Sequence, residues 1–213
     1  MKLDWKKTDK AFYLPGTDPG VITVPEFKFF SIRGQGNPNG EHFKDCIGVL
    51  YSLAYTVRMS YKSPNPPAGY VEYTVFPLEG VWDVSELVKS GPKSAVPGAL
   101  DKDQLVYHLM IRQPEFVTPD FARQVTETVR KKKPADLLDS VEFGAYEEGL
   151  CVQMLHLGSY DSEPASFAKM EEYCAAKSLA RKSMLHREIY ISNPGAGDQA
   201  KLRTVLRFQA VRG

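Results

Sequence analysis

The chain has 213 residues, of which 43% are hydrophobic and 25% are charged, the balance of an ordinary globular protein. Its 27 basic and 26 acidic side chains leave a net charge of +1, which excludes a strong electrostatic attraction to nucleic acid or to an anionic membrane. No apolar run approaches the roughly 20 residues that span a bilayer, and the charged N-terminus lacks the apolar stretch of a signal peptide. We therefore expect a cytoplasmic protein without a nucleic-acid or membrane partner.

The three cysteines and four histidines are scattered along the chain, without the spacing of a metal site or a redox pair. We therefore expect no metal and no cofactor. An odd number of distant cysteines favours buried free thiols in a reducing compartment. These cysteines are Cys46, Cys151 and Cys174.

In the first half of the chain, turn residues and hydrophobic periodicity predict an arm, three strands and one helix. A polar, turn-rich arm covers residues 1–20, and residues 21–34 form a strand with apolar side chains on both faces. An amphipathic helix over 41–61 follows, and strands over 70–77 and 105–113 are joined by a long segment that contains Trp82.

The second half repeats this order after a linking helix over 120–133 and a short helical turn before residue 141. Its predicted elements are a strand or bent hairpin strand over 141–160, a helix over 162–181 and strands over 184–192 and 201–211.

A twofold strand–helix–strand–strand order predicts an α+β fold of two pseudo-symmetric modules with antiparallel sheets. Apolar residues on both faces of several strands require the modules to join edge to edge or face to face. We expect the helices on one side and a ligand groove between the modules. The expected units are an arm (1–20), a first module (21–117), the linking helix (118–140) and a second module (141–213).

Glu188 is the unusual residue of the strand predicted over 184–192. Strand alternation places it on one face with His186 and Tyr190. On an enclosed face, a carboxylate among aromatic side chains is typical of a small-molecule site. An exposed cross-strand ion pair with Arg203 or Arg207 explains the pattern equally well.

Other aromatic and polar side chains are candidate ligand contacts, because a rigid aromatic wall beside one anion attracts flat and often cationic compounds. The alternative for each of them is a place in the core or a structural hydrogen bond. The candidates are Trp82, Tyr73, Tyr107, His156, Met110 and His186. The chain contains no nucleophile elbow, phosphate loop or dinucleotide fingerprint.

Three stretches, HLGSYDSEP, HREIYISNP and KLRTVLRFQAV, resemble the second half of GyrI-like small-molecule-binding proteins, relatives of the effector-binding domains of multidrug transcription activators. The resemblance covers roughly residues 20–213. It implies a groove between two modules with a buried glutamate at its floor. Glu188 matches that position, and Tyr190 follows two residues later. In the family this glutamate meets the positive charge of lipophilic drugs or serves a reaction.

The 20 residues before the first strand are too few for a helix-turn-helix, so direct DNA regulation is not expected. Some stand-alone members of the family resemble enzymes that hydrolyse cyclopropane-bearing natural products. This resemblance implies that Glu188 activates a water molecule, while Tyr190 or Tyr160 hydrogen bonds to the conjugated carbonyl. Trp82 and Tyr73 would stack on the ligand.

The sequence thus leaves three functions open: a binding protein that sequesters flat compounds, a hydrolase that opens cyclopropane rings, and an interaction module that inhibits a partner enzyme such as a gyrase. Exposed strand edges make a homodimer possible. Residues 83–104 are compatible with a lid or with a plain excursion.

Overall fold

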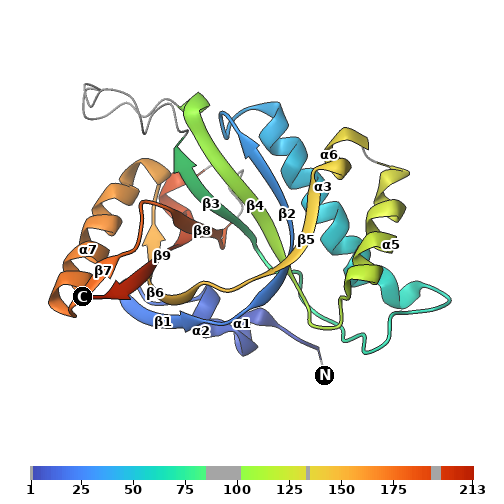
Figure 1. Ribbon diagram of the computed structural model, residues 1–213, viewed down its shortest axis with the longest axis horizontal. Coiled ribbons are helices and arrows are strands. Elements are labelled where there is room, and N and C mark those ends of the chain that lie inside the picture. Colours follow the sequence, from blue (N-terminus) through green and yellow to red (C-terminus); the bar gives the residue numbers. More distant parts are fainter. Residues whose placement is uncertain (1, 85–101, 133–134, 193–197) are drawn as a thin grey trace.

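The computed structural model describes residues 2–84, 102–132, 135–192 and 198–213, and every structural statement below refers to them. Their strands form one antiparallel sheet of nine strands in the order β1-β6-β9-β8-β3-β4-β2-β5, with β7 paired to β9 (Figure 1). The strands are β1 (Gly20–Val24), β2 (Phe27–Gln35), β3 (Leu78–Val84), β4 (Leu105–Gln113), β5 (Val141–Tyr146), β6 (Gly149–Leu157), β7 (Leu179–Arg181), β8 (His186–Tyr190) and β9 (Arg203–Arg212).

Two helices of 19 and 14 residues pack on this sheet, and the remaining described α-helices are shorter. The α-helices are α1 (Trp5–Thr8), α2 (Lys10–Tyr13), α3 (Glu41–Met59), α5 (Pro119–Arg130), α6 (Ala135–Asp139) and α7 (Glu163–Ala176). A short 3₁₀ turn, Tyr160–Ser162, leads directly into α7. The repeated order is β2–α3–β3–β4 and β6–α7–β8–β9, which confirms the predicted α+β class.

The strand predicted over 70–77 is wrong, since this segment makes only an isolated bridge from Tyr73 to Leu3 of the arm. Side chains from other segments satisfy its backbone carbonyl groups. The Trp5 indole donates to the Val75 carbonyl, and the Arg58 guanidinium donates to the Tyr73 carbonyl. The second strand of the first module is β3 instead.

Other boundaries also differ from the prediction. The strand predicted over 21–34 is interrupted at Pro25, because proline has no N–H to continue a ladder. The helix predicted to reach Arg181 ends at Ala176, two residues before Ser178, whose φ is 54°. Residues after Ser178 form β7.

The two modules join edge to edge through β3 and β8, so they share one sheet. The register pairs Gly80 with Glu188 and Trp82 with His186. Because directly paired residues of antiparallel strands share a face, the indole of Trp82 and the carboxylate of Glu188 lie on the same side.

That side is the helix face, defined as the sheet face that carries Glu188. The register continues from Glu188 to Leu206, and from Leu206 to Met154, which packs in the same apolar cluster as Met170 of α7. In the other direction it runs through Gly80 to Leu109, which packs in the cluster of α3. Both helices therefore cover one face, with α7 at one end of the molecule and α3 nearer the other (Figure 1).

The opposite face holds a buried polar cluster, which we call the opposite-face network: Glu79, Glu148, Gln153, Arg187 and Arg207. Arg187 contacts Glu79 Oε2 at 2.6 Å and Glu148 Oε1 at 2.9 Å, while Arg207 contacts Glu148 Oε2 at 2.9 Å. Glu188 is paired with Leu206, so Arg203 and Arg207 of β9 both point to the other face. The alternative of an exposed ion pair between Glu188 and either arginine is therefore wrong.

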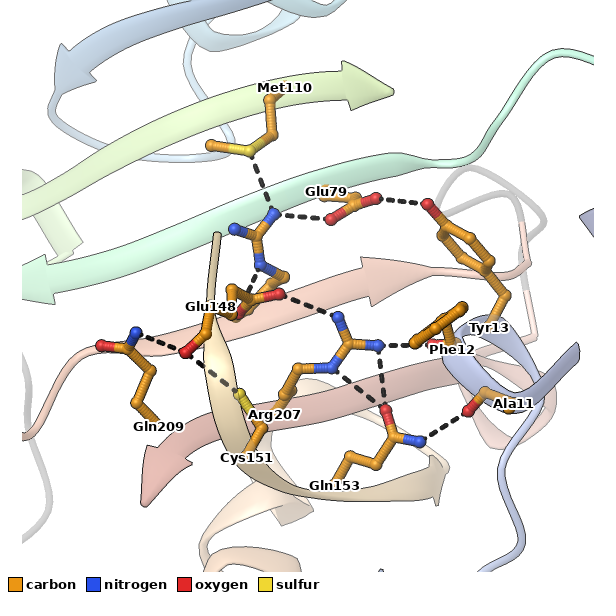
Figure 2. Close-up of polar contacts among 11 residues, drawn as sticks. Ala11, Phe12, Tyr13, Glu79, Met110, Glu148, Cys151, Gln153, Arg207 and Gln209 are labelled. Carbon is orange, nitrogen blue, oxygen red and sulfur yellow. Dashed lines mark hydrogen bonds and ion pairs between the residues drawn. The ribbon is translucent and has the colours of Figure 1, made fainter. Parts of the chain in front are cut away.

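The arm closes this network. Figure 2 shows Tyr13 pointing toward Glu79, to which its hydroxyl donates at 3.0 Å. The Phe12 carbonyl accepts from Arg207, and the Ala11 carbonyl accepts from Gln153. The arm is thus part of the fold rather than a loose lead-in.

None of the helices described combines the length and apolar character that crossing a bilayer requires. Cys46, Cys151 and Cys174 are buried free thiols, as predicted.

Candidate functional site

Glu188 lies on the helix face, near the middle of the joined sheet, and is only 8% exposed. Its Oε2 accepts a hydrogen bond of 2.9 Å from the Tyr190 hydroxyl, which in turn accepts one of 2.9 Å from the indole N–H of Trp82. Its Oε1 lies 3.4 Å from Nε2 of His186. The carboxylate is therefore held at both oxygens, by groups that β3 and β8 contribute.

A glycine makes room for this chain of hydrogen bonds. A Cβ at Gly80 would lie 2.9 Å from Nε1 of Trp82 and 3.2 Å from the Tyr190 hydroxyl. Gly80 is the direct strand partner of Glu188. A side chain at this position would displace the groups that orient the carboxylate.

Aromatic rings surround the carboxylate. Trp82 stacks on Phe43 of α3 with 5.7 Å between the ring centroids. It meets Tyr107 of β4 edge to face, with the centroids 5.8 Å apart. On the other side, Tyr160 meets Tyr190 at 6.2 Å, and Phe167 of α7 meets His186 at 4.8 Å. The surroundings are apolar enough to strengthen electrostatic contacts to the carboxylate.

The rings differ in exposure. Trp82 and Tyr107 are buried, whereas Tyr160 is 36% exposed, and the side chain of His186 is 23% exposed. Solvent therefore reaches the neighbourhood of Glu188 from the side of Tyr160 and His186. Burial and the charge of Glu188 raise the pKa of Tyr160 to about 12, so its hydroxyl remains a hydrogen-bond donor at neutral pH.

A second carboxyl group, that of Glu163, adjoins Glu188. It is the first residue of α7 and only 7% exposed. Burial, then the charge of Glu188 and a hydrogen bond to it, raise the pKa of Glu163 to about 9. A pKa in this range favours the protonated form of Glu163 at neutral pH, whose hydroxyl can donate to Glu188.

His156 supports the turn that carries Tyr160. Its Nδ1 lies 2.9 Å from the Ser166 hydroxyl of α7, and its Nε2 lies 3.0 Å from the Ser159 carbonyl. It is 4% exposed. These contacts tie β6 to the start of α7 and leave the ring little surface for a ligand.

The structure thus brings Glu188, Tyr190, Tyr160, Trp82 and His186 together. Tyr107 is one ring further away, behind Trp82.

Two candidates lie apart from this group. Tyr73 is 1% exposed, and its hydroxyl donates to the Ala54 carbonyl of α3. Met110 lies on the opposite face, where its sulfur contacts Arg187 (Figure 2). Most of the segment 83–104, expected as a lid or an excursion, lies outside the described residues.

Two hollows on the described surface lie elsewhere. One, of about 1060 Å³, is formed by α5, α6 and β5, and the other, of about 400 Å³, lies beside β7. Charged side chains rim the first, and two of them, Arg130 and Asp139, pair with each other at 2.7 Å. Neither hollow contains the convergence of perturbed and partly shielded groups seen around Glu188.

Two crystal structures of hydrolases from Listeria innocua are 32% and 34% identical to this chain, with TM-scores of 0.86 and 0.87. The matches cover 98% and 99% of this chain and 100% of the other chains. The C-terminal domain of EcmrR, at 13% identity and a TM-score of 0.50, shares the fold over 92% of this chain and 98% of its own. The chain is a GyrI-like protein. No protein-family model and no curated protein matches it.

Sequence reasoning proposed Glu188 as the central residue of this GyrI-like protein but did not single out Glu163 or Gly80, which the structure places beside it. Glu163 directly precedes Pro164 at a predicted helix start, where an acidic residue ordinarily complements the helix dipole from solvent. The only sequence signal that favoured a site there was its place within HLGSYDSEP, the stretch that carries the family resemblance. Gly80 carried no signal, because its neighbours on the adjacent strand were unknown.

Proposed function

We propose that this GyrI-like protein binds flat, hydrophobic and often cationic compounds in the cytoplasm, and that it hydrolyses electrophilic members of this class that carry a cyclopropane ring. The observation that carries the proposal is the geometry of Glu188. It is a shielded carboxylate in an aromatic site, held by Tyr190 and Trp82 and open to solvent beside Tyr160. The full-length similarity to hydrolases from Listeria innocua supports the choice of hydrolysis over sequestration alone.

Glu188 has the position of a general base. A water molecule beside it would lose a proton to the carboxylate while its oxygen attacks the ring CH2 of the ligand. The C–C bond to that carbon breaks, and its electron pair moves to the conjugated carbonyl oxygen, which becomes a hydroxyl when it takes a proton from solvent. Glu188 afterwards returns its proton to solvent, so water and ligand give one ring-opened product.

Tyr160 is better placed than Tyr190 to stabilise the developing charge on that oxygen. The Tyr190 hydroxyl already donates to Glu188, so its proton is committed. Within the described part of the chain the Tyr160 hydroxyl makes no hydrogen bond, and its ring is partly exposed. Tyr160 therefore offers a free donor at the rim of the site, worth about 10²–10³ in rate for a well-placed oxyanion contact.

Trp82 serves this site through its N–H rather than as an open stacking surface. Only 6% of the residue is exposed, because Phe43 and Tyr107 cover it. Its contact with Tyr190 nevertheless makes its fluorescence a reporter of ligand entry. The chain has two tryptophans, so a Trp5→Phe background leaves Trp82 as the only one.

The test uses an alkylator with a cyclopropane conjugated to a cyclohexadienone, whose absorbance is lost when the ring opens. We expect turnover by the wild type, a loss of about 10²–10⁴-fold in Glu188→Gln, and no loss in Glu142→Gln, an exposed carboxylate on β5. Saturable quenching of Trp82 without product would reduce the function to binding. The absence of both signals, or equal turnover by Glu188→Gln, would overturn the proposal.

A further inference from the structure

Glu163 is a buried carboxyl group for which the proposed reaction has so far no use. Its Oε1 is buried and meets no hydrogen-bond donor among the described residues. An ionised carboxylate in such a place would lose its hydration without compensation, at a cost that proteins avoid by pairing the charge or neutralising it. The environment of Glu163 therefore has to be explained by one of these two routes.

Among the residues that the structure describes, no cation is placed to pair with Glu163. The charged neighbours that act on Glu163 are Glu188 from β8 and Asp161 from the preceding turn, and both are acidic. His156 of β6 faces α7 through Ser166, and its remaining nitrogen is committed to Ser159. Neutralisation by a proton is the route that remains.

The Glu188 carboxylate can accept one further strong hydrogen bond. Tyr190 occupies Oε2, and the His186 contact at Oε1 is long, at 3.4 Å. The remaining titratable neighbour is Tyr160, which stays neutral. A protonated carboxyl group of Glu163, the hydrogen-bond partner of Glu188 on α7, would add a donor to this set.

We propose that Glu163 and Glu188 form a carboxyl pair that holds one proton, in which Glu163 carries the proton and orients Glu188 as the single anionic base of the site. Glu163 is thus a positioning residue that acts through Glu188. The contribution of this pair to turnover rests on the proposed function, whereas its protonation does not.

The arrangement has two chemical consequences. The pair carries one negative charge, which suits a ligand with one delocalised positive charge or a ring that water attacks. Loss of the second proton would put two like charges side by side and push the carboxyl groups apart. The raised pKa of Glu163, about 9, places that loss in the alkaline range.

Infrared difference spectroscopy tests the protonation without any ligand. At pH 7 we expect the C=O stretch of a protonated carboxylic acid in the wild type, its loss as the pH passes about 9, and its absence in Glu163→Gln. Glu171→Gln, an exposed carboxylate on the same helix, should retain the band. A wild type without the band, or Glu163→Gln with it, would overturn the proposal.

Should Glu163→Gln fail to fold, Glu188→Gln also tests whether the two carboxyl groups are coupled. It removes the negative charge next to Glu163, so the band should persist but titrate at a lower pH than in the wild type. An unchanged midpoint would show that the two carboxyl groups are not coupled and would overturn the pair.

Turnover provides the second readout. Because Gln keeps a neutral donor toward Glu188 but has no proton to lose, Glu163→Gln should lack the alkaline decline in turnover that we expect of the wild type near pH 9. The same alkaline decline in both proteins would overturn the positioning role. If the wild type turns over no probe, the proposed hydrolysis fails, but the infrared result still decides whether the carboxyl pair exists.

Discussion

The two faces of the β3–β8 junction bury carboxylates in opposite ways. On the opposite face, Glu148 lies between Arg187 and Arg207. Burial works to raise the pKa of Glu148, but the two guanidinium groups outweigh it and lower the pKa below its usual value. On the helix face, Glu163 and Glu188 adjoin each other with no arginine beside them in the described part of the chain, and the pKa of Glu163 rises to about 9.

The alternation of β8 separates these two environments by a single residue, since Arg187 and Glu188 are neighbours in sequence. An arginine-paired carboxylate keeps its charge but has no capacity left to take a proton or a ligand. A carboxylate held only by phenol, imidazole and carboxylic acid groups retains that capacity. The comparison indicates that the opposite face stabilises the fold, whereas the helix face carries the proposed site.

Breaking the opposite-face network should give the largest effect. Arg187→Leu leaves Glu79 and Glu148 with one cation fewer in a buried place, so we expect a loss of about 3–5 kcal/mol in the free energy of unfolding. Urea denaturation measures it. Arg203→Leu, an exposed arginine on β9, should change stability by less than about 0.5 kcal/mol. Equal effects would mean that the network contributes no more than a surface charge.

The second effect concerns the pH dependence of stability. Glu163 has a usual pKa near 4.5 and a folded-state pKa of about 9, so between these values the folded protein holds one proton that the unfolded chain has lost. The free energy of unfolding therefore falls as the pH rises through this window, by up to about 1.4 kcal/mol per pH unit. The stabilising contribution of this proton is fully present below pH 4.5 and is lost once the pH has passed about 9.

Comparison with Glu163→Gln isolates this slope. Over pH 6 to 8 the wild type should lose up to about 2.7 kcal/mol more than Glu163→Gln, since glutamine has no proton to release. Glu171→Gln serves as the control and should follow the wild type. Parallel curves for wild type and Glu163→Gln would place the proton elsewhere.

The sequence reveals the local properties of this fold, but not the pairing of its distant strands. Periodicity gave the module order and the face of Glu188, because side-chain alternation in a strand is a local property. It missed β3, since residues 70–77 alternate like a strand but pair with Trp5 and Arg58 instead. Register between distant strands is not local, and this is why Gly80 and the opposite-face network did not emerge from the pattern.

Glu163 illustrates the same limit in the site. An acidic residue before a proline at a helix start is ordinarily solvated, and only the packing of α7 against β6, fixed by His156 and Ser166, turns it inward. Met110 and Tyr73 show the opposite error, in which a predicted ligand contact lies away from the candidate site. Their residue types suited the wall of a ligand site, but strand parity places Met110 on the opposite face and helix packing buries Tyr73 against α3.

A smaller effect is expected from Gly80→Ala, which crowds the helix face without removing a titratable group. The new Cβ would lie 2.9 Å from Nε1 of Trp82, so the hydrogen bond to Tyr190 must shift. We expect a loss of about 1–3 kcal/mol in stability, as for other overpacked sites, together with weaker ligand quenching of Trp82. Gly20→Ala in β1, where a Cβ meets nothing within 4 Å, is the matched control. Unchanged ligand affinity in Gly80→Ala would detach the Trp82–Tyr190 contact from binding.

The smallest effect on stability should come from His186→Gln. This variant tests whether His186 stabilises the charge of Glu188 as Arg187 stabilises that of Glu148. The histidine contact to Glu188 is long, at 3.4 Å, and its side chain is 23% exposed, so it is a weak hydrogen bond in partial contact with water. We expect a change of less than about 0.5 kcal/mol in the free energy of unfolding and less than a few-fold in turnover. If instead the neutral glutamine costs several kcal/mol, His186 serves Glu188 as the arginines serve Glu148, and the two faces bury their carboxylates in the same way.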